Sequence, residues 1–267
     1  MGDVKEFYDN WTEKFLKDYL FGNRRTENTI NYAIKEISAH DSDILEIGCG
    51  IGWSSYEIAS HFPKAQVTAI DLSKESIKMA NALFSKGNIT FKPMNVHELS
   101  DDLIKKYDVI VMLDVYEHIS KQMRSTLHKS LNDLLASNGK IILTCPSIYH
   151  QRFLQKNHPE GLQPIDEEVT LDDLLTLANR LDSILSSYIL KNISHRFDYI
   201  HASISRSMIY EPISITRNIY PNLESKISRL LRLEDSKYAK SYSSLIEKAK
   251  SRYRFRYKYF KLKSYFQ

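Results

Sequence analysis

Three glycines at alternate positions, 48, 50 and 52, follow directly after the apolar run of residues 44–47. Glycine is unfavourable inside a strand or a helix, so this spacing predicts that a ligand lies close to the backbone. A strand, a glycine turn and a helix start together expose backbone N–H groups to such a ligand. A dinucleotide fingerprint would need glycine where Trp53 stands, and the Gly-Lys-Ser/Thr ending of a phosphate-binding loop is absent. The turn is therefore predicted to hold a ligand of another kind.

Short apolar runs alternate with segments of helical spacing up to residue 145. The runs are residues 44–47, 67–70, 89–91, 109–113 and 141–145. Fully apolar strands that alternate with amphipathic helices predict a parallel sheet with helices on both faces. Ser73 and Thr170 are each predicted to open a helix, and Asn138-Gly139 to close the helix that contains Leu127 and Leu135.

The pattern changes over residues 145–169, where Pro146, Pro159, Gly161 and Pro164 predict a loop or insertion. Two β-rich runs follow, residues 186–193 and 197–205, with few residues between them. Such runs predict an antiparallel pair at the edge of the sheet.

Bulk composition limits the class of protein. A chain of 267 residues with a net charge of +4 fits one large α/β domain or one domain with an appendage, and the mild charge does not by itself indicate nucleic acid. Cys49 and Cys145 lie in apolar strand-end contexts and are predicted to be reduced core thiols. No apolar run reaches about 18 residues, and the chain does not begin with a secretion signal. We therefore expect a cytoplasmic protein without a membrane span.

An acidic residue precedes the glycines, and further elements follow in a recognisable order. Glu46 begins the pattern, Asp71 ends the second apolar run, Asn95-Val96 follows the third, and Glu117-His118 follows the fourth. Over roughly residues 7–205 the sequence resembles the class I S-adenosylmethionine-dependent methyltransferases, in their small-molecule branch. The resemblance implies a Rossmann-like, doubly wound sheet of seven strands, mostly parallel with the last strand antiparallel. It also implies a helical N-terminal lid over residues 1–40, a core over 41–206 and a helical, basic C-terminal extension over 207–267.

The resemblance also implies which residues meet S-adenosylmethionine. Asp71 would accept hydrogen bonds from the ribose hydroxyls, Asn95-Val96 would meet the adenine, and Glu46 would lie near the ammonium. Arg25, in preference to Arg24, would pair with the methionine carboxylate, and Tyr8, Trp11 or Tyr19 would shield the sulfonium. The complete predicted set is Tyr8, Trp11, Arg25, Glu46, Gly48, Gly50, Asp71, Leu72, Asn95, Val96 and Leu113. Plainer alternatives are a helix cap for Asp71, a core anchor for Trp11 and a solvated surface charge for Arg25.

Methyl transfer from a sulfonium is an in-line displacement that needs alignment and exclusion of water, and no metal is required. A base is needed when the acceptor is an alcohol. His118 is the first candidate, and one of its neighbours, Tyr116 or Glu117, is the alternative contact for the acceptor. Tyr149 and His150 follow the fifth strand, where an acceptor pocket is expected. The alternative for His118 is a helix-start histidine bonded to the backbone, and for Tyr149 and His150 it is an ordinary surface or core side chain. The histidines show no metal-ligand spacing.

Residues 248–263 contain eight Lys or Arg and no acid, with aromatic residues between them. Three interpretations stay open: a packed C-terminal helix, a peripheral surface for anionic groups, and RNA binding, which ranks lowest. The predicted function is methyl transfer from S-adenosylmethionine to a small-molecule acceptor, at an oxygen, in a pathway such as surface-glycan or secondary-metabolite biosynthesis. The alternatives are an RNA or protein methyltransferase and a small-molecule N-methyltransferase.

Overall fold

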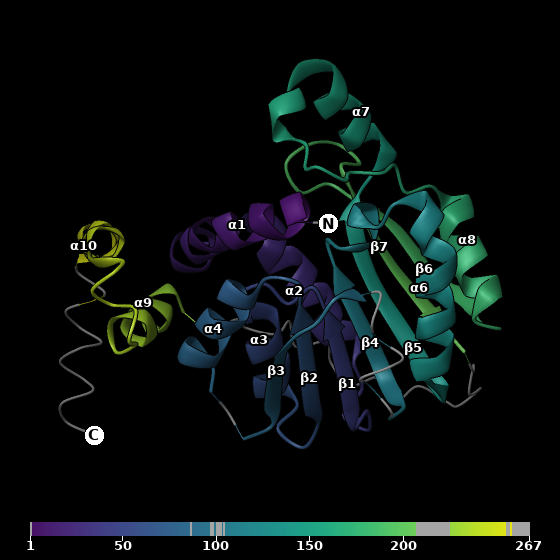
Figure 1. The fold of residues 1–267 in the computed structure, drawn as a ribbon, viewed down its shortest axis with the longest axis horizontal. Helices are drawn as coiled ribbons and strands as arrows, with labels where there is room; N and C mark the ends of the chain where they lie inside the picture. The colour runs from purple at the N-terminus through teal and green to yellow at the C-terminus, as the bar shows by residue number, and fades with distance from the viewer. Residues whose placement is uncertain are drawn as a thin grey trace.

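One seven-stranded sheet organises the part of the chain that the computed structural model describes, which is residues 2–85, 87–96, 99, 103, 105–206, 225–254 and 257 (Figure 1). The strands are β1 (Asp43–Ile47), β2 (Gln66–Asp71), β3 (Ile89–Pro93), β4 (Tyr107–Leu113), β5 (Leu135–Pro146), β6 (Ile184–Lys191) and β7 (Tyr199–Ser205). Their order is β3-β2-β1-β4-β5-β7-β6. β1 to β5 pair in parallel, whereas β7 runs antiparallel to both β5 and β6. The predicted Rossmann-like sheet with an antiparallel last strand is confirmed.

Helices cover both faces of the sheet and create two apolar cores. On one face, α1 (Gly2–Phe21), α2 (Arg24–Glu36), α3 (Trp53–His61) and α4 (Lys74–Leu83) contribute to the first core. On the other face, α6 (Lys121–Leu134) and α8 (Leu171–Arg180) contribute to the second. The central strands are buried from both sides, which explains why their sequences are apolar without alternation. The predicted caps of α4 and α8 are present, because Ser73 accepts from the Ser76 amide and Thr170 forms a capping box with Asp173.

The fifth strand begins earlier than the sequence pattern predicts. The prediction that Asn138-Gly139 closes a helix is wrong, since α6 ends at Leu134 and β5 begins at Leu135, which pairs with Tyr107. Gly139 lies within β5, where an added Cβ would be 3.0 Å from the Tyr107 carbonyl oxygen. The glycine therefore serves a close approach of two strands rather than the end of a helix.

The predicted loop after β5 contains a helix. Ser147 accepts a hydrogen bond from the His150 amide and caps α7 (Ile148–Asn157), after which a short 3₁₀ turn, η3, covers Pro159–Gly161. Within α7 only Gln151 is buried. The helix was missed because it lacks the apolar stripe by which a packed helix is recognised. It stands above the carboxyl edge of the sheet (Figure 1).

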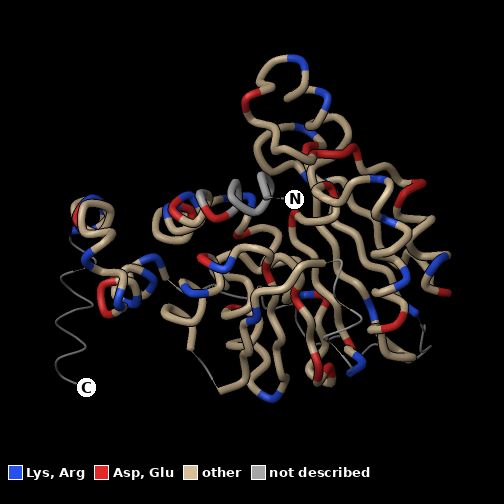
Figure 2. Tube along the Cα trace, viewed as in Figure 1, with Lys and Arg blue, Asp and Glu red and all other residues tan. Residues whose placement is uncertain are grey.

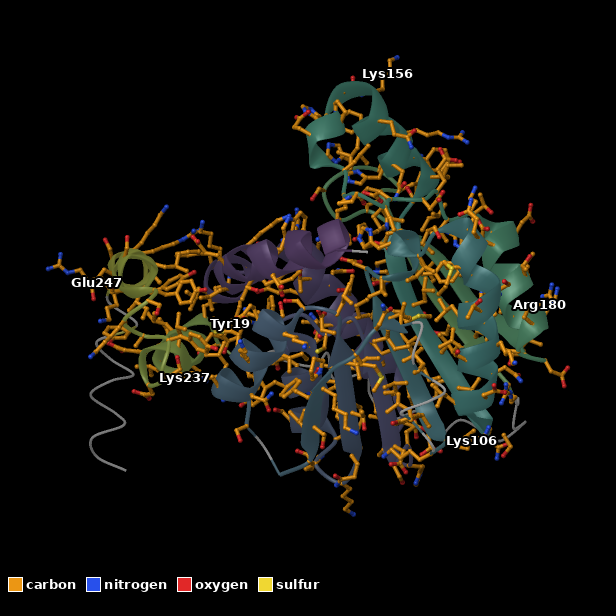
Figure 3. All side chains as sticks on the ribbon, in the orientation of Figure 1. Tyr19, Lys106, Lys156, Arg180, Lys237 and Glu247 are labelled. Atoms are coloured by element: carbon orange, nitrogen blue, oxygen red, sulfur yellow. The ribbon has the colours of Figure 1, made fainter. Side chains whose placement is uncertain are left out.

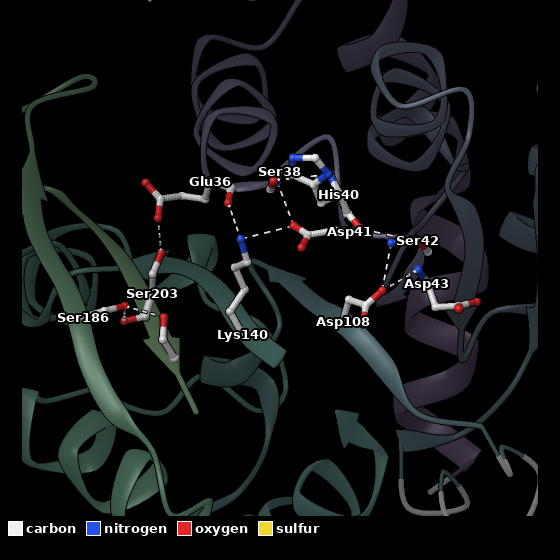
Figure 4. Close-up of polar contacts among 11 residues, drawn as sticks. Glu36, Ser38, His40, Asp41, Ser42, Asp43, Asp108, Lys140, Ser186 and Ser203 are labelled. Atoms are coloured by element: carbon white, nitrogen blue, oxygen red, sulfur yellow. Dashed lines mark hydrogen bonds and ion pairs between the residues drawn. The ribbon is translucent and has the colours of Figure 1, made fainter. Parts of the chain in front are cut away.

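Polar contacts at the opposite edge of the sheet fix the end of α2 (Figure 4). Lys140 Nζ donates to the Glu36 carbonyl at 2.9 Å and pairs with Asp41 at 3.1 Å. The Ser203 hydroxyl donates to the Glu36 carboxylate at 2.8 Å. These contacts tie α2 to β5 and β7, and so hold the helix that carries Arg25.

Two helices beyond the sheet, α9 (Lys226–Glu234) and α10 (Ser243–Arg252), pack beside α1 and extend the first core through Leu230, Leu233 and Ile246. Tyr19 of α1 lies toward these helices (Figure 3). Lys and Arg are spread over many elements rather than gathered on one (Figure 2). Residues 207–224, 255–256 and 258–267, with half of the basic tail, lie outside the described residues. No helix in the described ranges is long and apolar enough to cross a membrane.

Candidate active site

A cavity of about 120 Å³ lies at the carboxyl edge of β1 and β4. The glycine turn forms one wall, and Leu113, Asp114 and His118 form another. α1 and α2 close it with Trp11, Phe15, Asp18 and Arg25. Of the predicted residues, this arrangement brings together Trp11, Arg25, Gly48, Gly50, Leu113 and His118.

The glycine turn adopts backbone angles that other residues rarely reach. Gly48 has φ +76° and Gly50 has φ +52°. A Cβ on Gly48 would collide with Val115 Cγ2, whereas one on Gly50 would lie 3.5 Å from the Phe15 ring. Their bare backbones therefore allow a close approach from the cavity and from the side chains packed around it.

Asp71 holds this turn in place from the end of β2. Its carboxylate accepts hydrogen bonds from the Gly50 amide at 2.8 Å and from the Ser73 amide at 2.8 Å. Burial raises the pKa of Asp71, although both amides oppose the shift. α1 covers this corner, because the Ser73 hydroxyl donates to Asp9 at 2.5 Å and Thr12 lies 3.3 Å from Ser76.

The residues predicted to meet ribose and adenine are not brought to the cavity. Asp71, Leu72, Asn95 and Val96 are absent from its walls, and Val96 packs against the second core instead. Asp71 is not the N-cap of α4, which is Ser73; it accepts a hydrogen bond from the Ser73 amide. Their role in cofactor binding stays a prediction.

Glu46 lies inside the sheet rather than at the cavity. Its carboxylate is 1% exposed and accepts a hydrogen bond from the Ser55 hydroxyl of α3. Burial raises the pKa of Glu46 to about 7, and the hydroxyls of Ser54 and Ser55 oppose the shift. Glu46 thus links β1 to α3 behind the glycine turn, and its predicted contact with an ammonium group is untested.

Arg25 enters the cavity from the first turn of α2, which Asn23 caps. Its Nε lies 3.3 Å from Asp114 Oδ2, and its guanidinium lies 5.9 Å from the Tyr199 ring. Tyr199 and Asp114 raise the pKa of Arg25 above its already high value. Asp114 has φ +57°, a left-handed conformation that is unusual outside glycine. Neither Asp114 nor Tyr199 was predicted from the sequence. The acidic residue at the end of a strand was a usable signal for Asp114, but no sequence signal marked Tyr199.

The aromatic candidates of α1 lie in different places. Trp11 lines the cavity, packs edge-on to Phe15 at 6.1 Å and has Lys14 Nζ 3.6 Å from its ring centroid. Tyr19 is buried between Trp53 and Phe84 instead. The Tyr8 side chain lies outside the described residues.

His118 belongs to a 3₁₀ turn, η2 (Tyr116–His118), that follows β4. Its Nδ1 lies 2.8 Å from the Ile165 carbonyl oxygen, which only accepts, so Nδ1 carries the proton and Nε2 the lone pair. Burial lowers the pKa of His118, which keeps the ring neutral. The two interpretations of His118 therefore coincide, since it bonds to the backbone and also lines the cavity.

The other two catalytic candidates lie away from the cavity. Tyr149 on α7 is 63% exposed. His150 packs against Phe153 and His195, with centroids 6.5 Å and 6.1 Å away, and burial lowers its pKa. Neither residue is among those that line the cavity.

The described residues fit the chemistry of S-adenosylmethionine. This molecule carries a sulfonium and an ammonium against one carboxylate, and the cavity wall carries two acids, Asp18 and Asp114, against one cation, Arg25. The backbone at Gly48 and Gly50 faces the same space. Ligands of this size usually occupy pockets of about 300–1,000 Å³. The cavity between these walls is smaller than that range.

Comparison with known proteins agrees with this geometry. Residues 44–139 match a family described as a methyltransferase domain. A ubiquinone biosynthesis O-methyltransferase from Rickettsia typhi is 34% identical over 144 residues, 51% of this chain and 55% of that protein. A malonyl-[acyl-carrier protein] O-methyltransferase from Ilyobacter polytropus is 29% identical over 164 residues, 57% of this chain and 58% of the relative. The chain thus matches little more than half the length of these relatives.

A solved structure shares the fold. Magnesium protoporphyrin IX methyltransferase from Synechocystis PCC 6803, with bound S-adenosylhomocysteine, superposes with a TM-score of 0.54 at 20% identity, over 69% of this chain and 83% of the other. The family match runs from β1 to the first residues of β5. Residues 44–139 thus match a methyltransferase domain, within a seven-stranded sheet that has the fold of solved S-adenosylmethionine-dependent methyltransferases.

Proposed function

We propose that the protein transfers the methyl group of S-adenosylmethionine to an oxygen of a small-molecule acceptor. One observation carries the proposal: the bare backbone of Gly48 and Gly50 faces the same cavity as the neutral imidazole of His118. One cavity therefore contains both the backbone that would contact the cofactor and a side chain that can accept a proton.

Separate residues of this chain would bind the cofactor, exclude water and accept the proton. When bound, S-adenosylmethionine supplies a methyl group that is already activated. Arg25 would pair with the methionine carboxylate, and Trp11 and Phe15 of α1 would exclude water. His118 would accept the hydroxyl proton at Nε2 while Ile165 holds its Nδ1–H.

The names of two relatives favour oxygen as the acceptor atom, because both are described as O-methyltransferases. They differ in acceptor, and the chain covers only part of each, so they support the reaction class rather than a particular substrate. The small-molecule N-methyltransferase and the RNA or protein methyltransferase remain the alternatives that the experiment must separate.

The test is to incubate the purified protein with methyl-labelled S-adenosylmethionine and matched pools of alcohols and phenols, carboxylates, amines, RNA and proteins. Label transfer to a hydroxyl, with formation of S-adenosylhomocysteine, is expected. His118→Asn should lower turnover by about a hundredfold, as expected for loss of a general base, and leave S-adenosylhomocysteine affinity within about twofold. Label in amine, RNA or protein pools alone would contradict the proposal.

A further inference from the structure

Three buried polar side chains from three elements converge beside Arg25 and Asp114. Glu117 Oε2 of η2, Gln151 Oε1 of α7 and the Tyr199 hydroxyl of β7 make no standard hydrogen bond with any described residue. Glu117 and Gln151 are each 1% exposed, and Tyr199 is 2% exposed. Buried polar atoms are nearly always hydrogen-bonded in folded proteins, so three such atoms in one region indicate a missing partner.

Interactions with shared neighbours place these groups around one centre. Tyr199 interacts electrostatically with Arg25, Asp114 and Glu117, and its hydroxyl also lies close enough to Asp114 for a weak hydrogen-bonding interaction. Glu117 interacts with Asp114, Asp166 and Arg25. Gln151 donates to Asp166 at 2.5 Å, and the Glu167 amide donates to the Glu117 carbonyl at 2.8 Å. Arg25 and Asp114 line the cavity, whereas Glu117, Gln151 and Tyr199 lie behind its walls. The two lining residues thus connect the buried group to the proposed methyl-transfer site.

The charges around this centre exclude an anion. Arg25 is the one cation among the described residues that line the cavity; it pairs with Asp114 and, in the proposed function, with the methionine carboxylate of the cofactor. Asp166 adds a second acid on the Glu117 side. A carboxylate or phosphate brought here would face acids without a free cation to neutralise it.

The unsatisfied groups match a hydroxyl instead. A phenol can donate or accept, and an amide oxygen accepts. Burial and Asp114 raise the pKa of Glu117 well above its usual range, so its carboxyl is protonated and can also do both. A hydroxyl likewise donates and accepts, and so can pair with each of them. The Tyr116 hydroxyl, by contrast, already has a hydrogen-bond partner, because it lies 2.9 Å from His128 Nε2.

We infer that Glu117, Gln151 and Tyr199 form, beside Arg25 and Asp114, the acceptor subsite, and that it takes an uncharged acceptor bearing hydroxyl groups. This inference rests on the proposed function and narrows it. It favours phenols or polyols over carboxylic acids and phosphate esters as substrates.

The test measures binding of two matched probes, catechol and benzoate, to the full chain saturated with S-adenosylhomocysteine. Catechol should bind at least about tenfold more tightly than benzoate in the wild type. Tyr199→Phe and Glu117→Leu should each reduce that preference to about threefold or less, whereas Glu117→Gln, which keeps both hydrogen-bonding capacities, should retain most of it. Tyr107→Phe is the matched control, because Tyr107 is a buried tyrosine at the start of β4, away from the cavity. It should leave the preference unchanged.

Rescue by Glu117→Gln separates a binding role from a general loss of packing. Equal or stronger binding of benzoate in the wild type would overturn the inference, as would the same loss in Glu117→Gln and Glu117→Leu. Selective catechol binding without methyl transfer to any hydroxyl would uphold the subsite while contradicting the proposed function. Methyl transfer to benzoate with no catechol binding would contradict the subsite while upholding the proposed function.

Discussion

Glu46 shows how a single buried carboxyl couples the fold to pH. The group titrates at about 7 in the folded protein against 4.5 for the free side chain. Between these values the unfolded chain has released the proton and the folded chain still holds it. The free energy of unfolding therefore falls by about 3 kcal/mol as pH rises from 4.5 to 7, and this contribution is constant above 7.

Glu46→Gln should remove that slope, because the amide oxygen can still accept from Ser55 and carries no charge. Denaturant unfolding at pH 5 and pH 8 should show the variant gaining on the wild type by about 2–3 kcal/mol at the higher pH. Asp71 and Glu117 also have raised pKa values and shift both proteins alike, so the difference between the two isolates Glu46. Parallel pH profiles would show that Glu46 is not the titrating group.

Gly48 gives a second prediction at this scale. Alanine there would adopt φ +76° and strike Val115, so Gly48→Ala should lower the free energy of unfolding by about 2–4 kcal/mol. In a Val115→Ala background the collision is gone and only the backbone strain, about 1–2 kcal/mol, should remain. A double-mutant cycle with additive effects would show that the Val115 contact is not what requires glycine.

The residues that could be predicted from the sequence are those that act through backbone conformation or backbone hydrogen bonds. The glycines at 48 and 50 do take left-handed angles, and Asp71 does end β2 beside them. Tyr199 and Gln151 could not be found in this way, because they reach the region from β7 and α7 through tertiary packing. Glu117 was predicted only as one of two neighbours of His118 that could contact the acceptor, because its burial cannot be read from the sequence.

At the scale of elements, Arg229 of α9 connects three helices around the cavity. It is 2% exposed and donates to the Tyr19 carbonyl of α1 at 3.3 Å and to Glu27 of α2 at 3.1 Å. Its guanidinium also lies 4.2 Å from the ring of Trp53, which lines the cavity at the start of α3. α9 thereby holds the helix that covers the glycine turn.

Arg229→Gln should loosen that cover. We expect a dissociation constant for S-adenosylhomocysteine raised by about tenfold and faster amide hydrogen exchange in α1, because a buried ion pair and a ring contact are lost. Arg232→Gln is the matched control from the same helix, since Arg232 contacts Tyr56 and the Leu83 carbonyl instead of α1. If both variants lose affinity equally, α9 acts through general stability and not through α1.

The strands were predictable because burial on both faces leaves continuous apolar runs. α7 and the start of β5 were not predictable for the opposite reason. α7 exposes most of its surface, and β5 extends back to Leu135 because Leu135 pairs with β4 and Lys140 pairs with both β4 and β7. Turn residues such as Asn138-Gly139 are locally more typical of a helix end, and tertiary pairing overrides that preference.

At the scale of the whole molecule, α9 and α10 belong to the first core. Leu230, Leu233, Ile246 and Ala249 are all buried in it beside Leu16 and Tyr19 of α1. A chain that ends after residue 206 should therefore melt at least about 10 °C lower in calorimetry and bind S-adenosylhomocysteine more weakly. An unchanged melting temperature, with RNA binding alone lost, would make the extension a separate module and revive the RNA interpretation of the tail.

The contact between Arg229 and Tyr19 joins positions 210 residues apart in the chain. At translation rates of about 5–20 residues per second, α1 would wait on the order of 10–40 s before α9 is made. During that interval the side of α1 that packs against α9 has no partner. A nascent chain would therefore release bound S-adenosylmethionine quickly. Ribosome-associated chaperones should therefore bind the nascent chain at α1. The protein should retain bound S-adenosylmethionine only after α9 has been synthesised.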